Sequence, residues 1–156
     1  MTVTTAQTRI VPQSPSRLAR TLTTGNIWLV GVLSAVAGAL VTEAFALVAR
    51  ASGVPMEAAG SGATEAAEIP VGGFAGGVLF WSVVGIVLAP ALARWAGRPA
   101  RTFVAITVPL TALSMIAPAL APHTATSTQI ILALSHVVAA AVIIPPLARR
   151  LSAQHR

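Results

Sequence analysis

The chain alternates between four long apolar stretches and short polar segments. The apolar stretches cover residues 27–49, 71–93, 103–121 and 128–148. Because an α-helix rises about 1.5 Å per residue, roughly 20 apolar residues cross the hydrocarbon core of a bilayer. Each stretch reaches that length. The pattern predicts an all-α fold, a four-helix transmembrane bundle, in which residues 27–150 form one domain.

Two polar segments flank this bundle. Residues 1–26 are rich in Thr, Ser, Gln and Pro without apolar periodicity, so we expect a disordered cytoplasmic tail. Residues 151–156 are expected to form a short C-terminal tail. A cleaved signal peptide ending near Ala49 is the competing interpretation. Its apolar run would be about 22 residues, however, longer than the roughly 7–15 residues of a signal peptide core.

The arginines predict the orientation of the bundle. All ten basic residues are arginine, and only Arg50 falls on one side of the spans; the others are Arg9, Arg17, Arg20, Arg94, Arg98, Arg101, Arg149, Arg150 and Arg156. Positively charged segments stay in the cytoplasm during insertion. We therefore expect cytoplasmic N- and C-termini in a multi-pass protein of the plasma membrane. Because these arginines flank apolar spans, they leave no basic surface for nucleic acid.

Small and polar residues recur at helical spacing, and they mark the faces expected to meet other helices. Small residues let the backbones of membrane helices approach closely. The first span carries two such ridges, and its leucines at 33, 40 and 47 occupy faces better suited to lipid. The ridges and the matching stripes of the third and fourth spans are Gly31, Ala35, Ala39 and Glu43; Ser34, Gly38 and Thr42; Thr107, Thr111, Ser114 and Pro118; Gln129, Ala133, His136 and Ala140.

The second span begins with a run of glycines, Gly72, Gly73, Gly76 and Gly77. Their spacing makes two overlapping pairs of small residues four apart, which is typical of a helix-contact face. The same face is a candidate surface for a homodimer or for another membrane protein. The run lacks the Lys and Ser/Thr of a phosphate-binding loop.

The prolines within the spans are expected to have two different effects, to kink a helix or to end it. Pro109 and Pro118 are expected to kink the third helix. Pro90, Pro145 and Pro146 lie near the predicted cytoplasmic ends of their helices, where we expect them to terminate those helices.

Glu43 and His136 are the titratable side chains deepest within the spans. Glu43 lies roughly 7 Å, and His136 roughly 4 Å, to the outer side of the middle of its helix. A charged carboxylate near the bilayer centre costs at least about 2.5 kcal/mol, so its presence requires a reason. A carboxyl group and an imidazole are the groups that proton transfer uses, which makes Glu43 and His136 the candidate catalytic pair. The structural alternative is that Glu43 hydrogen-bonds His136, Ser114 or Thr111 and fixes helix register.

Six further residues are candidates to bind a substrate beside this pair: Trp81, Ser82, Thr111, Ser114, Gln129 and Glu68. Trp81 has the alternative role of filling the core, and Glu68 that of a helix cap or rim residue before the second span. Glu43, Glu68, His123 and His136 lack the spacing of zinc motifs, so no metal site is predicted. No cofactor is predicted either, because the chain carries no dinucleotide or Walker motif, and without cysteine it has no thiolate nucleophile.

The chain resembles a family of small actinobacterial four-span membrane proteins that is known only as a domain of unknown function. The residues behind this resemblance are Glu68-Ile69-Pro70 at the entry to the second helix and, in the fourth, Ser135-His136 and Ile144-Pro145. The resemblance covers about residues 27–150. It implies a fold class and no activity.

Three functions fit these observations. The first is binding of an apolar small molecule, or its acid–base isomerisation or cyclisation, in an intramembrane cavity around Glu43 and His136. The second is a non-catalytic scaffold or accessory subunit that contacts a partner through the face around Gly76. The third is a proton-coupled exporter, which four spans with one glutamate in the first helix resemble in outline. Whether the protein is an enzyme stays open at this point.

Overall fold

The computed structural model describes residues 25–60 and 62–154. In this part of the chain four helical segments are long and apolar enough to cross a membrane. They are α2 (Ile27–Ala51), α3 (Gly73–Trp95), α4 (Pro99–Ser114) continued by α5 (Ile116–Ala119), and α6 (Thr126–Ala153). The predicted four-helix bundle is confirmed, and the chain is an integral membrane protein with four candidate spans. The tail predicted over residues 1–26 lies almost wholly outside the described residues.

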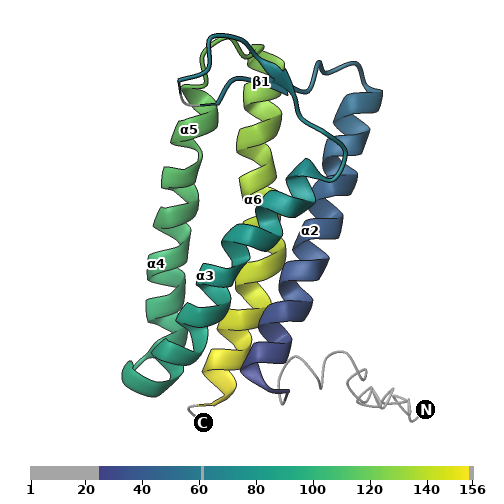
Figure 1. Ribbon diagram of the computed structural model, residues 1–156. Helices are drawn as coiled ribbons and strands as arrows, with labels where there is room; N and C mark the ends of the chain where they lie inside the picture. The colour runs from purple at the N-terminus through teal and green to yellow at the C-terminus, as the bar shows by residue number, and fades with distance from the viewer. Residues whose placement is uncertain (1–24, 61, 155–156) are drawn as a thin grey trace, which may run out of the picture.

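The helices run alternately up and down (Figure 1). α2 packs against α3 and α6, and α4 packs against the same two helices from the opposite side. α2 therefore begins, and α6 ends, at one end of the bundle, beside the turn between α3 and α4. This end carries Arg94, Arg98, Arg101, Arg149 and Arg150, and we call it the arginine end. The other end, with residues 52–72 and 120–125, is called the loop end.

Local sequence explains where the helices begin and end. The side chain of Asn26 accepts a hydrogen bond of 3.0 Å from the backbone N–H of Trp28, which caps the start of α2. Pro99 occupies the first turn of α4, where its missing N–H is not needed. α4 stops at Ser114, and Pro118 explains the break because it has no N–H to continue the helical ladder.

The prediction that Pro145 and Pro146 end the fourth helix is wrong. α6 runs through both prolines and continues to Ala153. Beyond the prolines, Leu147 and Leu151 are completely buried. Their packing offsets the backbone hydrogen bonds that the prolines remove. Pro90 likewise lies inside α3, five residues before its end at Trp95.

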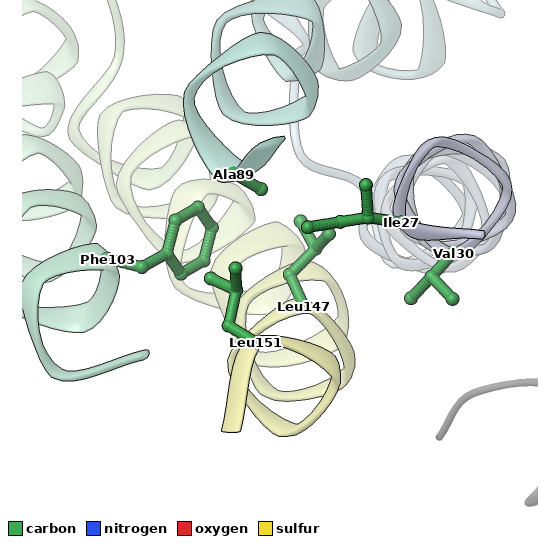
Figure 2. Close-up of a cluster of buried hydrophobic side chains, with 6 residues drawn as sticks. All are labelled: Ile27, Val30, Ala89, Phe103, Leu147 and Leu151. Carbon is green, nitrogen blue, oxygen red and sulfur yellow. The ribbon is translucent and has the colours of Figure 1, made fainter. Parts of the chain in front are cut away.

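A cluster of buried apolar side chains closes the arginine end (Figure 2). It takes residues from all four helical segments: Ile27, Val30, Ala89, Phe103, Leu147 and Leu151. Phe103, with 1% of its surface exposed, lies between Ala89 and Leu151 in Figure 2. The cluster fixes the relative positions of the helices at the end where their charged segments leave the bundle.

The packing face predicted for the first span is confirmed. Both ridges of small residues on α2 are buried except for Glu43, which is half-buried, whereas Leu33, Leu40 and Leu47 are exposed. A Cβ on Gly31 would lie 3.1 Å from Ile86 of α3, and one on Gly38 would lie 2.7 Å from Ile143 of α6. α2 is thus the helix on which the bundle is assembled, and its glycines permit the close approach.

Candidate functional site

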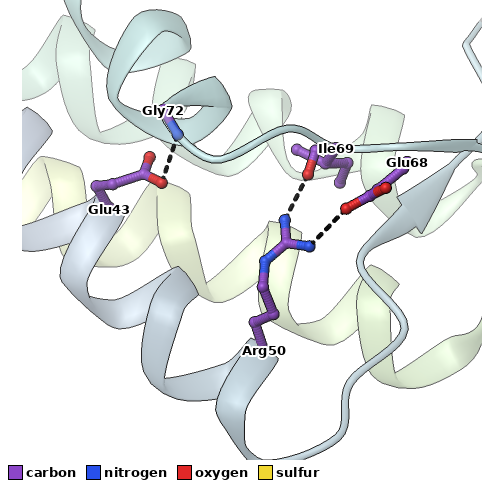
Figure 3. A network of polar contacts seen from close by, with 5 residues as sticks. All are labelled: Glu43, Arg50, Glu68, Ile69 and Gly72. Atoms are coloured by element: carbon purple, nitrogen blue, oxygen red, sulfur yellow. Dashed lines mark hydrogen bonds and ion pairs between the residues drawn. The ribbon is translucent and has the colours of Figure 1, made fainter.

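The carboxylate of Glu43 binds the beginning of α3 (Figure 3). One of its oxygens accepts a hydrogen bond of 2.7 Å from the backbone N–H of Gly72, and the other accepts one of 2.9 Å from that of Ala75. Gly72 is the N-cap residue of α3 and has no side chain to cap the helix. Glu43 therefore caps α3 from the neighbouring helix.

Two physical effects favour an anion at this position. The first N–H groups of a helix have no partner within the helix, and the helix dipole adds a partial positive charge there. Gly72 has a φ of 88°, in the left-handed region that favours glycine, and this turns its N–H toward Glu43. Both oxygens of Glu43 thus serve as acceptors for backbone N–H groups at the start of α3.

Arg50, two turns further along α2, extends this network (Figure 3). Its guanidinium donates to the carboxylate of Glu68 at 3.0 Å and to the backbone carbonyl of Ile69. Glu68 is largely exposed, so this ion pair is a surface interaction of modest strength. Of the two roles considered for Glu68, the rim position agrees with this geometry, and the helix cap is supplied by Glu43 instead.

The segment between α2 and α3 is folded against the loop end. It forms two short antiparallel strands, β1 (Glu57–Ala58) and β2 (Ala67–Glu68). The side chain of Met56 is completely buried together with Ala46, Ala49 and Phe74. The hydroxyl of Thr124, in the turn before α6, accepts a hydrogen bond of 3.1 Å from the N–H of Ala59. The long and the short connections therefore form one cap over the helices.

His136 has a separate environment. Its Nδ1 lies 2.7 Å from the carbonyl oxygen of Leu132, one turn earlier in α6. No hydrogen bond joins His136 to Glu43, although both residues are described. The structural interpretation expected Glu43 to bond His136, Ser114 or Thr111. Its two partners are backbone N–H groups of α3 instead.

The other polar residues predicted at the site bond mainly to the backbone near them. The hydroxyls of Thr111 and Ser114 donate to the carbonyls of Thr107 and Thr111 in their own helix. The amide of Gln129 donates to the carbonyl of Ala121 at 2.9 Å and holds the start of α6 to the preceding turn. Within the described residues, these contacts bring none of the three side chains to Glu43.

Four buried hydroxyls have no hydrogen-bond partner in the described chain: Ser34, Thr42, Ser82 and Thr128. Contacts between α2 and α3 place Gly31 beside Ile86 and Gly38 beside Val78. In antiparallel helices this register puts Ser34 and Ser82 at the same level. Ser82, a predicted substrate-binding residue, thus lies in the interface between α2 and α3.

Trp81 and two glycines of the predicted contact face, Gly76 and Gly77, face away from the bundle. Trp81 is 71% exposed, so neither the core role nor a place beside Glu43 agrees with its position. A Cβ on Gly76 or Gly77 would meet no atom within 4 Å. α3 instead turns Phe74, Ser82 and Ala89 inward. At Gly76 and Gly77, the predicted glycine face is therefore not used for packing within the described part of the chain.

Two hollows on the described surface lie elsewhere. One is formed at the arginine end by residues of the turn between α3 and α4 and by the end of α6. The other is an open apolar groove along α3, lined by Val83, Val84, Val87, Leu88 and Ala91. Neither is lined by Glu43 or His136. Among the described residues, no three His, Asp or Glu side chains converge as metal ligands would.

Sequence reasoning did not identify the backbone N–H groups of Gly72 and Ala75, or Arg50, as partners in the network at the loop end. The sequence does contain a signal for the two backbone N–H groups. A helix that begins with glycines has no capping side chain of its own, and a nearby carboxylate in an apolar span is the natural replacement.

Comparison with known proteins gives one match. Searches of curated proteins and of solved structures found none. A family model described as a family of unknown function (DUF6069) matches residues 22–153, which include all four helical segments. The match carries no activity, organism or number of spans. The chain belongs to this family of unknown function, DUF6069.

Proposed function

We propose that this protein is a non-catalytic membrane subunit that associates with a second transmembrane protein through the outward face of α3. The observation that carries this proposal is the open space beside Gly76 and Gly77. The most apolar stretches of α3, of α4 with α5, and of α6 are each 11% buried, so the two glycines, and not the exposure of the helix, distinguish α3.

Glycine is a poor choice for a helix face that meets only lipid. It destabilises a helix by about 1 kcal/mol relative to alanine. Within a membrane this loss is offset where a neighbouring helix packs closely against the glycine, as the side chain of Ile143 packs against Gly38 inside this bundle. Gly76 and Gly77 have no such neighbour among the residues that the structure describes. A helix of another subunit would supply one.

The residues around these glycines fit the same role. Phe80 and Trp81 lie one helical turn after Gly76 and Gly77, and they are 69% and 71% exposed. Large aromatic side chains beside a small-residue notch give a partner helix both contact area and close approach. The partner is a transmembrane helix, and a second copy of this chain is the case that purified protein can test.

Cysteine cross-linking in membranes tests the association. The natural chain has no cysteine, so Val83→Cys introduces a single thiol on the outward face of α3. Val108→Cys places the matched thiol on an exposed position of α4. We expect oxidation to cross-link the α3 variant to a second copy, or to another membrane protein that has a cysteine close to position 83. The yield should be at least several-fold above that of the α4 variant.

Gly76→Leu should abolish that cross-linking while the protein stays folded, because the added side chain fills open space. Ala105→Leu on exposed α4 is the matched control and should leave it unchanged. Equal cross-linking from both cysteine positions, or full cross-linking in Gly76→Leu, would refute the α3 interface.

The acid–base hypothesis for Glu43 and His136 is the second candidate. The buried hydroxyls of Ser34, Thr42 and Ser82 favour it, because an interior ligand would give them partners. Against it, Glu43 already accepts two backbone hydrogen bonds, and neither hollow adjoins the pair. The same engagement of Glu43 disfavours the exporter. A measured turnover that Glu43→Gln and His136→Ala abolish in folded protein would reverse this ranking.

We also propose that the protein lies in the plasma membrane with its arginine end facing the cytoplasm. Among the described residues, five arginines lie at that end, and Arg50 alone lies at the loop end. We expect a cysteine at exposed Ala63 to react with an impermeant maleimide added to intact cells, and one at exposed Gly97 to react only after lysis. The reverse pattern would refute the orientation.

A further inference from the structure

The hollow at the arginine end lies where the turn between α3 and α4 meets the end of α6. Its volume is about 380 Å³, and its lining includes Gly97, Arg98, Ala100, Arg101, Leu151 and Ser152. Arg98 and Arg101 are exposed, and each belongs to the lining. Two arginines thus belong to the lining of one concave surface.

The backbone adds to the positive potential of this hollow. Arg98 is the N-cap residue of α4, and no side chain caps the helix. Pro99 has no N–H, so Ala100 and Arg101 supply the first N–H groups, which have no partner within the helix. Both residues line the hollow. The start of α4, where the first N–H groups have no partner within the helix, therefore borders the same hollow as the two arginines.

The position of the hollow restricts its ligand. It lies at the end of the apolar helices, beside Trp95, which is 78% exposed, as aromatic residues at the membrane interface are. All four glutamates of the chain are at or toward the loop end, so no acidic side chain competes for the arginines here. Leu151 supplies an apolar floor, buried against Phe103.

We propose that this hollow binds the phosphate group of an anionic phospholipid. The guanidinium groups of Arg98 and Arg101 contact the phosphate oxygens with paired N–H donors, and the first N–H groups of α4 complete the contact. The acyl chains continue along the apolar surface of the helices. Basic hollows between membrane helices bind lipid headgroups in this way.

Lipid binding to the purified full-length protein tests this inference. The protein, in a neutral detergent, is titrated with dioleoyl-phosphatidylglycerol, and bound lipid is counted by native mass spectrometry. We expect the double variant Arg98→Gln/Arg101→Gln to bind at least about tenfold more weakly than the natural chain. Dioleoyl-phosphatidylcholine, which carries no net charge, should bind no better to the natural chain than to this variant.

The matched control removes the same charge outside the hollow. Arg94 and Arg149 are exposed at the same end and are not among its lining residues, so Arg94→Gln/Arg149→Gln should change binding by less than about threefold. Equal losses in the two double variants would show diffuse charge attraction and overturn the site. Displacement of the lipid by inorganic phosphate at equal concentration would assign a soluble phosphate instead and overturn the lipid assignment.

A second variant covers the case in which the arginine variant does not fold. Ser152→Phe keeps both arginines and fills the hollow, because the exposed Ser152 lies on its rim. We expect the same loss of phosphatidylglycerol binding, with the helical circular dichroism signal of the natural chain. Unchanged binding in Ser152→Phe would overturn the proposal.

Discussion

Replacing Glu43 with glutamine is expected to lower the free energy of unfolding by about 2 kcal/mol, because the carboxylate is the cap of α3. The amide keeps one acceptor oxygen, but it loses the charge that the helix dipole stabilises, and its NH₂ group faces an N–H donor. The change removes one of the two hydrogen bonds to Gly72 and Ala75. Reversible unfolding in mixed micelles, followed by circular dichroism, measures the effect.

Glu65→Gln is the matched control, since Glu65 is exposed in the same loop end. We expect its free energy of unfolding to equal that of the natural chain within about 0.5 kcal/mol. Hydrogen exchange adds a local readout, because Glu43→Gln should speed exchange at the first N–H groups of α3. If Glu43→Gln and Glu65→Gln proved equally stable, Glu43 would not be a structural cap, and its role as an acid–base group would gain support.

The helices and the packing face of α2 were predictable because their signals are periodic. Every span reaches the length that a bilayer requires, and the two ridges on α2 combine small residues that nothing but close packing explains. The burial of Ser34, Gly38 and Thr42 confirms this face. Helix ends were less predictable. Pro145 and Pro146 indicated an end to the fourth helix, and the packing of Leu147 and Leu151 carried α6 beyond them.

The partner of Glu43 could not be predicted from side chains, because the partner is backbone. A carboxylate within an apolar span indicates a donor nearby, and the donors predicted for Glu43 were side chains, His136 among them. The N–H groups of Gly72 and Ala75 are marked in the sequence only indirectly, by the glycines that leave the start of α3 without a capping side chain. They become donors only because α3 begins where α2 places Glu43, which is a property of the tertiary structure.

The rotation of α3 about its own axis, which decides the face that points into the bundle, could not be predicted from the sequence either. This helix is apolar on every side, so periodicity does not separate its inward face from its outward face. Its glycines were predicted to face the other helices of the bundle. In the structure, Ser82 and Ala89 of α3 face inward instead. Trp81, considered for the core or a pocket, was thereby turned outward. The same rotation leaves Gly76 and Gly77 free, which is the basis of the proposed interface.

Gly38→Leu is expected to lower the free energy of unfolding by about 3 kcal/mol, because the position is already in contact with two helices. A Cβ on Gly38 would lie 2.7 Å from Cγ1 and Cδ1 of Ile143, and 3.6 Å from Val78. The larger leucine side chain would force α2 away from α6. Ala105→Leu, at an exposed position of α4 away from the proposed α3 interface, is the control and should leave the free energy of unfolding nearly unchanged.

A double-mutant cycle separates this contact from the intrinsic preferences of the residues. In the natural background Gly38→Ala pushes its Cβ into Ile143, whereas in an Ile143→Ala background the two atoms it would meet are gone. We expect Gly38→Ala to become more favourable by about 1 kcal/mol in that background, measured by unfolding in mixed micelles. Because alanine also forms helices better than glycine, Gly38→Ala should then stabilise the protein outright. Equal effects of Gly38→Ala in both backgrounds would mean that α2 and α6 do not meet at this glycine, and the arrangement of the bundle around α2 would have to be revised.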